Sequence, residues 1–280
     1  MRRKTQTFLP SPGRDISPDD ERALMEQLGY VPPNVCCVSA RSGGENGDGD
    51  HSTTTVVDTS IGGAGRPIAI KSYPLLVQLH DYIVDANVLD DTDDDDLAHR
   101  IPFPTLYWLS CPHVSRAISE LERGGYVRIF QRRLEDDDSG LLGAGWWACH
   151  GAYADERWDA LSARDREWLL REDALLGGGG GGEDHKRRRS MMEMIRTSGV
   201  AGTDHNSWGG TRSGGGGGGG GGTASVPSVK CLHSHYAHYR SQLSRCNAGD
   251  DNDDDENVVL NMVGKWTHEL LLECFPEILL

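Results

Sequence analysis

Val229-Lys-Cys-Leu-His-Ser-His-Tyr-Ala-His-Tyr239 is the stretch around which the rest of this chain is predicted to be built. It holds one cysteine and three histidines within eight positions, although the whole chain has only seven cysteines and eleven histidines. Ser228 is a suitable N-cap, and apolar residues recur at helical spacing at Leu232, Tyr236, Tyr239 and Leu243. The stretch therefore predicts a helix with one buried face, against which the rest of the chain packs.

The polar residues of this helix are not spread evenly around it. At 100° per residue, Cys231, His235 and His238 fall within about 60° of one another, beside the apolar stripe. His233 points to the opposite side. The predicted helix thus has an edge of side chains that can ligate a metal next to its buried face.

Biased segments interrupt the rest of the chain. Gly177–Gly182 and Gly214–Gly222 are pure glycine, and Asp90–Asp96 and Asp250–Glu256 are almost entirely acidic. We expect a single domain over residues 16–272, preceded by a flexible tail at 1–15, and disordered inserts at 42–65, 84–99, 135–145, 173–189, 204–225 and 247–256.

The acidic runs explain the net charge. They contribute six acids at 90–96, four at 135–138 and six at 250–256, and these 16 acids are about equal in number to the formal net charge of −15. The remaining core is therefore close to neutral. Because nucleic-acid binding requires a basic surface, we do not expect nucleic acid as a partner.

Several further elements follow from local patterns. Helices are predicted at 18–28, 112–123 and 146–171, with another turn or two at 190–197 and a helix capped by Asn257 near the C-terminus. Strands are predicted at 34–39, 66–73, 105–109 and 126–130, so that 105–130 has the dimensions of a βαβ-like unit. The order predicts an α+β fold, with a small sheet and a helix-rich C-terminal part.

The cysteine number and the hydropathy bear on the cellular compartment. Seven cysteines without a framework spacing are typical of reduced, intracellular thiols. No apolar run approaches 18 residues, which predicts no membrane span. We expect an intracellular, cytoplasmic protein, with an organelle or the nucleus as the alternatives.

Three separated motifs identify a family. Pro102-Phe-Pro-Thr-Leu-Tyr-Trp-Leu-Ser-Cys-Pro112, Gly199-Val-Ala-Gly202 and the stretch from Val229 to His238 resemble, in this order, the mainly bacterial domain-of-unknown-function family 501. The resemblance extends from about Leu24 to Leu271 and implies no particular reaction. Bacterial members often carry Cys-Pro-Cys-Gly after the first strand, whereas this chain has the cysteine-free insert that begins at Ser42.

The first functional hypothesis is a metal site for zinc or a similar ion. Side chains at i and i+3 or i+4 on one helix can share an ion, as Cys231 with His235 or His235 with His238. Seven residues rise about 10.5 Å along a helix, so all three cannot bind one ion without a ligand from elsewhere. Cys111 is the predicted additional ligand, in a pocket shared with the helix.

The second hypothesis is a site for a phosphate-bearing small ligand. Helix N-termini attract phosphate through free N–H groups, and Cys231 lies in the first turn of its predicted helix. The residues expected to bind such a ligand are Lys230, Arg66, Lys71, Gly199 and Gly202.

The third hypothesis is a thiol-dependent enzyme, either a hydrolase or a transferase. Cys111 and Cys231 both lie at predicted helix N-termini, where a thiolate is favoured. His113, His233 or His235 would be the base. A purely structural or interaction protein is the fourth alternative, because cysteine, tyrosine and histidine often fill protein cores.

Overall fold

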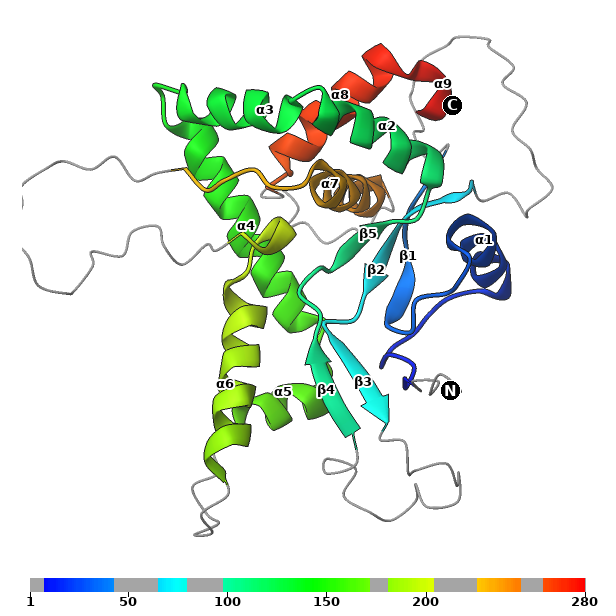
Figure 1. Ribbon diagram of the computed structural model, residues 1–280, viewed down its shortest axis with the longest axis vertical. Helices are drawn as coiled ribbons and strands as arrows, with labels where there is room; N and C mark the ends of the chain where they lie inside the picture. Colours follow the sequence, from blue (N-terminus) through cyan, green and yellow to red (C-terminus); the bar gives the residue numbers. More distant parts are fainter. Residues whose placement is uncertain are drawn as a thin grey trace, which may run out of the picture.

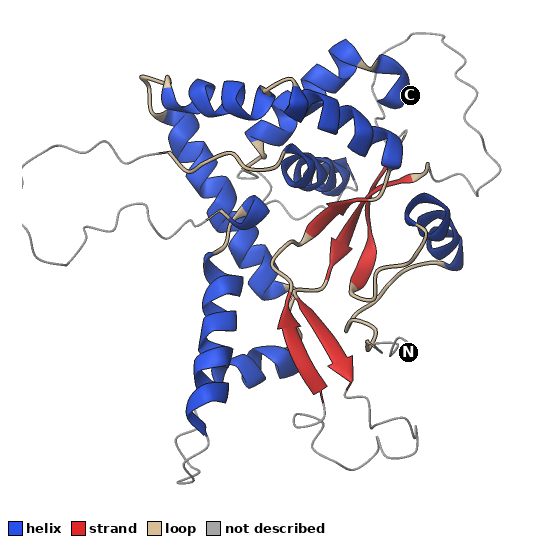
Figure 2. Cartoon of the chain, viewed as in Figure 1, coloured by secondary structure: helices blue, strands red, loops and turns tan. Residues whose placement is uncertain are grey.

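The computed structural model describes residues 8–42, 65–79, 98–171, 181–203, 226–247 and 259–279. This part of the chain forms one α+β domain, in which helices surround a small set of strands (Figure 2). The strands are β1 (Val35–Arg41), β2 (Pro67–Ser72), β3 (Leu75–Leu79), β4 (Ala98–Pro102) and β5 (Tyr107–Leu109). The helices are α1 (Pro18–Leu28), α2 (Pro112–Arg123), α3 (Tyr126–Glu135), α4 (Leu141–Asp159), α5 (Ala163–Leu170), α6 (Gly181–Thr197), α7 (Leu232–Asn247), α8 (Met262–Cys274) and α9 (Pro276–Leu279).

The strands form two antiparallel sheets. One has the order β1-β2-β5, with Val38 opposite Ile70 and Ile70 opposite Trp108. The other consists of β3 and β4, with Val77 opposite Arg100. Only Pro74 and Tyr73 separate β2 from β3, so the chain passes almost directly from one sheet into the other.

Helix α7 occupies the centre of the fold. Figure 1 shows it between the three-stranded sheet on one side and α2 and α8 on the other. Leu232 and Tyr236 join the core that includes residues of α2 and α8, whereas Ala237 packs with residues of β2 and β5. Helix α1 covers the other face of the sheet, where Leu24 packs against Val35 and Ile70. Burial on two sides makes α7 the packing element that its sequence predicted.

The contact between α7 and α8 depends on one glycine. A Cβ atom on Gly264 would lie 2.3 Å from the carbonyl oxygen of His235 and 2.4 Å from the Cβ of Tyr239. Any larger residue at position 264 would therefore push the two helices apart.

Many of the predicted elements are present. Helix α1 begins and ends as predicted, with Ser17 accepting from the Asp20 N–H and Gly29 in the left-handed conformation that ends the helix. Helix α2 begins at Pro112 with Cys111 at the N-cap. The predicted strands at 34–39, 66–73 and 105–109 correspond to β1, β2 and β5, whereas β3 and β4 were not predicted.

The prediction of a strand at 126–130 is wrong, and with it the βαβ-like unit. Residues 126–135 form α3, which buries Phe130 and Leu134 at a spacing of four. The helical periodicity of the ten residues 126–135 outweighs the β-propensity of the five residues 126–130. The single helix expected at 146–171 is instead α4 and α5, because Ser162 accepts from the Asp165 N–H and begins a new helix.

Helix starts near the C-terminus also differ from the predictions. Helix α7 begins at Leu232, so Cys231 rather than Ser228 precedes its first residue. Helix α8 is capped by Asn261, whose side chain accepts from the Gly264 N–H. The expected cap, Asn257, lies outside the described residues.

Three segments expected to lack structure are ordered in part. Within the expected tail, the Leu9 N–H donates to the Val77 carbonyl. The expected insert at 135–145 is the end of α3, a turn closed by Asp137 and the start of α4. In the insert expected at 173–189, residues 181–189 belong to α6. The other expected inserts lie almost wholly outside the described residues, apart from Ala98 and His99 at the start of β4 and single residues at three segment ends.

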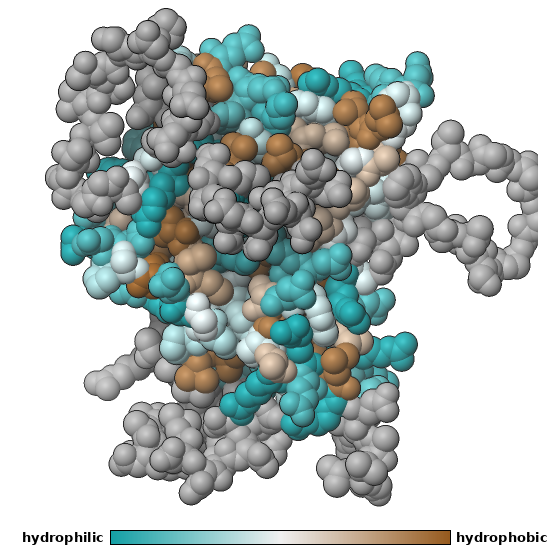
Figure 3. All heavy atoms as spheres, turned by 180° about the vertical axis from the view of Figure 1, so that it is seen from behind, coloured by the Kyte–Doolittle hydropathy of each residue, from teal (hydrophilic) through white to brown (hydrophobic). Residues whose placement is uncertain are grey.

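Two surface properties of the described residues bear on partners. No described helix has the length and hydropathy needed to cross a membrane. On the face shown in Figure 3, the hydrophobic residues that grey atoms leave visible lie in several separate groups among hydrophilic ones. Isolated exposed apolar residues of this kind are ordinary on protein surfaces.

Candidate functional site

Three side chains that can ligate a metal converge where α2 meets the start of α7. Glu122 lies in the last turn of α2, Cys231 directly before α7, and His233 in its first turn. One ligand atom from each lies within 4.8 Å of the other two, and this is the one such group of three or more in the part of the chain that the structure describes. We refer to these three residues as the α2–α7 triad.

Two of the three separations within the triad are close to those of a tetrahedral zinc site. His233 Nδ1 lies 3.2 Å from Glu122 Oε1 and 3.9 Å from Cys231 Sγ. Zinc bonds of about 2.0–2.3 Å in a tetrahedron require ligand separations of about 3.3 Å between nitrogen and oxygen and about 3.6 Å between nitrogen and sulfur. These two separations lie within a few tenths of an ångström of the required values, whereas the Cys231 sulfur and the Glu122 oxygen lie within 4.8 Å of each other and would have to approach to about 3.6 Å to bind one ion.

Each residue of the triad is oriented by a hydrogen bond to the protein. His233 Nε2 lies 3.0 Å from the Ser115 carbonyl oxygen, which can only accept, so Nε2 carries a proton. Nδ1 is then the nitrogen available to a metal. The Leu232 N–H donates to Glu122 Oε1 at 2.8 Å, and the Ser234 N–H donates to the Cys231 sulfur.

The electrostatics of the triad favour charged forms in the metal-free protein. Burial alone would lower the pKa of His233, but the contacts with Cys231 and Glu122 outweigh it and raise the pKa to about 9. Burial alone would raise the pKa of Cys231, because it disfavours the thiolate, but the hydrogen bonds from His233 and Ser234 outweigh burial and lower the pKa. The side chains of His233 and Glu122 keep 24% and 28% of their exposure, so an ion or a small molecule can reach them from solvent.

The predicted ligands His235 and His238 lie elsewhere. Both are fully buried, and their Nδ1 atoms lie 3.1 and 3.2 Å from the side-chain nitrogen of Asn261. Their rings pack against Trp146 and Tyr107, respectively. Burial lowers the pKa of both histidines, that of His238 to about 4. These are neutral core histidines, and they form no ligand group with Cys231.

Cys111 is likewise separate from the triad. It lines a pocket at the start of α2 that also includes Arg66 and His113. Arg66 was predicted to bind phosphate, whereas Cys111 and His113 were candidates for the nucleophile and the base of a thiol enzyme. Within the described residues, the group that the structure brings together and that could hold a metal is therefore Glu122, Cys231 and His233, and not the predicted set of Cys111, Cys231, His235 and His238.

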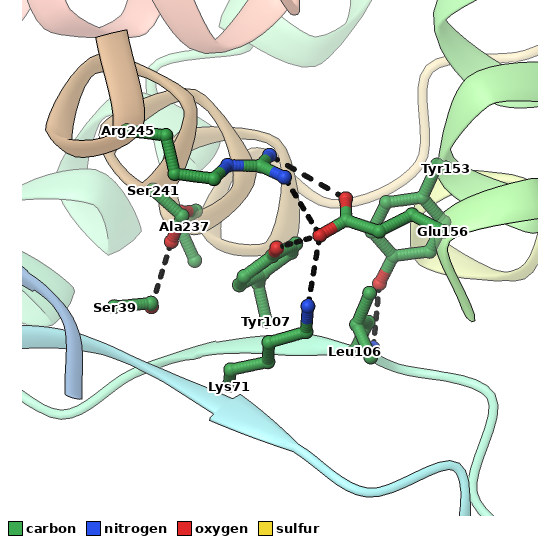
Figure 4. A network of polar contacts seen from close by, with 9 residues as sticks. All are labelled: Ser39, Lys71, Leu106, Tyr107, Tyr153, Glu156, Ala237, Ser241 and Arg245. Atoms are coloured by element: carbon green, nitrogen blue, oxygen red, sulfur yellow. Dashed lines mark hydrogen bonds and ion pairs between the residues drawn. The ribbon is translucent and has the colours of Figure 1, made fainter. Parts of the chain in front are cut away.

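The remaining predicted residues have other contacts. Lys230 Nζ donates to the backbone carbonyl of Gly202, so two of the expected ligand-binding residues are in contact. Gly199 lies against the ring of His150, where a Cβ would be 2.3 Å from Nδ1. Lys71 forms an ion pair with Glu156, 3.1 Å from Nζ to Oε1. Lys71, Gly199 and the Lys230–Gly202 pair thus each have contacts of their own, and Figure 4 shows that of Lys71 with Glu156.

Sequence reasoning missed Glu122. It falls in the last turn of a correctly predicted helix, but one glutamate in a surface turn carries no pattern that marks it as a ligand. The contact depends on how α2 packs against α7, which local patterns do not determine. His233 was predicted only as one of three alternative bases, and its predicted direction, away from His235 and His238, is the one that meets α2.

Comparisons with known proteins place the chain in a family without assigning an activity. A family model described as "Protein of unknown function (DUF501)" matches residues 59–250, which is more than half of the chain and includes all three triad residues. No curated protein and no solved structure matches the chain. The chain therefore belongs to the DUF501 family of proteins of unknown function.

Proposed function

We propose that this protein binds a zinc ion at the α2–α7 triad. The observation that supports the proposal is the convergence of a thiol, an imidazole and a carboxylate from two helices within 4.8 Å. Thiolate sulfur, imidazole nitrogen and carboxylate oxygen are the protein ligands of zinc, and soft sulfur disfavours magnesium and calcium.

The hydrogen bonds around the triad support the same proposal. A histidine that ligates a metal usually donates its second ring N–H to a carbonyl or a carboxylate, and Ser115 supplies that carbonyl. The N–H groups of Leu232 and Ser234 orient the carboxylate and the thiol. These orienting contacts reduce the freedom that the ligands must lose when a metal binds.

Three protein ligands leave the fourth tetrahedral position to water or to an atom of a small ligand. Zinc sites with an open position are typical of catalysis, whereas structural sites have four protein ligands. Zinc with one thiolate, one carboxylate and one neutral imidazole has no net charge. The open position can therefore accept a neutral or an anionic donor without a large electrostatic penalty.

Calorimetric titration of zinc into metal-free protein tests the proposal. We expect one ion per chain, and a loss of at least tenfold in affinity in Cys231→Ser and in Glu122→Gln. Cys111→Ser is the matched control and should bind zinc like the original protein. Equal zinc affinity in Cys231→Ser, or a loss in Cys111→Ser, would contradict the proposed ligand set.

Thiol chemistry at Cys231 is a second candidate function. It is favoured by the contact between Sγ and His233 Nδ1 and by the N–H group of Ser234 at the same sulfur, which both stabilise a thiolate. Iodoacetamide should alkylate Cys231 faster than the exposed Cys274 in metal-free protein. Slower alkylation of Cys231 than of Cys274 would exclude this second function and leave the zinc proposal unaffected.

A further inference from the structure

Helix α2 contacts both ring nitrogens of His233. The Ser115 carbonyl oxygen and the Ser119 hydroxyl oxygen lie 3.0 and 3.3 Å from Nε2. On the other side of the ring, Glu122 Oε1 lies 3.2 Å from Nδ1. Residues 115, 119 and 122 follow one another at the i, i+4 and i+7 spacing of one helix face, so a single stripe of α2 faces the imidazole.

The hydroxyl of Ser119 is an acceptor towards His233. Its single proton goes to the Ser115 carbonyl oxygen, which lies 3.0 Å away and can only accept. The lone pairs of the hydroxyl oxygen are then left for the Nε2–H group of His233, which donates to the same carbonyl. Two oxygens of α2 therefore share one imidazole N–H, and Ser119 supplies the one that belongs to a side chain.

These contacts bear on the orientation of the ring. Rotation of an imidazole about its Cβ–Cγ bond is only weakly restricted by the side chain itself, so neighbouring groups must select the orientation. A half-turn would place a ring carbon instead of Nδ1 opposite Cys231 and Glu122. A metal ion would replace the contacts at Nδ1, whereas those at Nε2 would persist in the metal-bound protein.

We propose that Ser119 is a positioning residue of the metal site, because its hydroxyl holds the Nε2–H group of His233 and keeps Nδ1 directed at the other two triad residues. The inference rests on the proposed zinc site. Groups that hold the second nitrogen of a ligating histidine typically contribute about tenfold or more to metal affinity. Because the Ser115 carbonyl remains when Ser119 is replaced, we expect a smaller loss of roughly threefold.

Hydrogen exchange of the His233 Nε2 proton, followed by nuclear magnetic resonance in metal-free protein, tests the contact without zinc. Exchange should be roughly threefold faster or more in Ser119→Ala, the factor that corresponds to one lost hydrogen bond of ordinary strength. Ser115→Ala is the matched control in the same helix, because alanine keeps the backbone carbonyl, and it should exchange like the original protein. Ser119→Thr keeps a hydroxyl that can also bond the carbonyl four residues back, and should restore slow exchange.

A purely structural role of Ser119 predicts a lower unfolding free energy in Ser119→Ala with no change in the exchange of this one proton. Equal exchange in Ser119→Ala and the original protein would overturn the inference. So would an Nε2 proton that exchanges too fast to detect in the original protein, since that proton would not be held by two acceptors.

Zinc titration of the same variants extends the test to the metal site. Zinc affinity should fall roughly threefold in Ser119→Ala, return in Ser119→Thr and stay unchanged in Ser115→Ala. Zinc that binds through Cys231 with equal affinity in Ser119→Ala would overturn the positioning role and leave the zinc proposal intact. Absence of zinc binding in the original protein would contradict the zinc proposal, and with it the role of Ser119 in metal binding, but not the hold of Ser119 on the His233 ring.

Discussion

At the scale of single residues, the triad is built from backbone hydrogen bonds as much as from side chains. The Ser115 carbonyl determines which nitrogen of His233 carries a proton, and the N–H groups of Leu232 and Ser234 hold the other two ligands. Two of these backbone groups belong to the first turn of α7, where helix N–H groups have no partner within the helix. The helix start is therefore what assembles the site.

The raised pKa of His233 predicts how zinc affinity depends on pH. At pH 7 the metal-free imidazole is protonated, because its pKa is about 9, and zinc must displace that proton. Zinc affinity should increase roughly tenfold for each pH unit between about 6 and 8 if one proton is released. Titrations in buffers of different ionisation enthalpy would count the protons. An affinity that does not change over this range would show that His233 is not a ligand.

The residues of the triad could be predicted only in part. Cys231 and His233 were identified because a helix with several ligand-type side chains is visible in one sequence. The helical pattern placed Cys231 beside His235 and His238 and put His233 on the opposite side, so His235 and His238 were predicted as ligands and His233 only as a base. The structure instead brings His233 to Cys231, because Cys231 precedes α7, and buries His235 and His238. Their burial against Trp146 and Tyr107 is a tertiary property. Glu122 could not be found for the same reason.

At the scale of elements, α7 and α8 approach each other through Gly264. Gly264→Ala should reduce the free energy of unfolding by about 1–3 kcal/mol, because its Cβ would overlap the backbone of α7. Gly151→Ala is a matched control in α4, where a Cβ meets nothing within 4 Å. That control should be neutral or should stabilise by about 0.5–1 kcal/mol. Urea denaturation measures the unfolding free energies of both variants. Equal changes in Gly264→Ala and Gly151→Ala would contradict the close packing of α7 on α8.

Elements with strong local signals were predicted best. Ser17, Pro18 and Gly29 define both ends of α1, and Pro112 defines the start of α2. The error at residues 126–130 has a physical cause, since Tyr126-Val-Arg-Ile-Phe130 has β-prone composition within a longer helical pattern. Strands β3 and β4 form a two-stranded sheet, which Phe8 joins only through an isolated bridge to Gln78. Short strands of this kind depend on their partner more than on their own sequence.

At the scale of the whole molecule, buried neutral histidines make the fold sensitive to acid. The pKa of His238 falls from 6.5 in the unfolded chain to about 4 in the folded protein, and that of His235 is also well below its usual value. Their contribution to stability is complete above about pH 6.5 and is lost as the pH falls towards 4. The unfolded chain binds the protons that the core excludes.

Unfolding free energies measured between pH 7 and pH 4 test this sensitivity. His238 alone should account for a loss on the order of 3 kcal/mol, at about 1.4 kcal/mol for each pKa unit. His238→Gln keeps an amide oxygen that can accept from Asn261 but cannot titrate, so its unfolding free energy should fall less over the same range. The same loss in the original protein and in the variant would show that His238 is not a buried neutral group.

The central claim is that Cys231, His233 and Glu122 bind one metal ion, and the absorption spectrum of the cobalt-substituted protein tests it most directly. Tetrahedral cobalt with one thiolate ligand should give intense visible bands and one sulfur-to-metal charge-transfer band, saturating at one ion per chain. The charge-transfer band should disappear in Cys231→Ser and persist in Cys111→Ser. A weak octahedral spectrum, or a charge-transfer band that survives Cys231→Ser, would contradict the account.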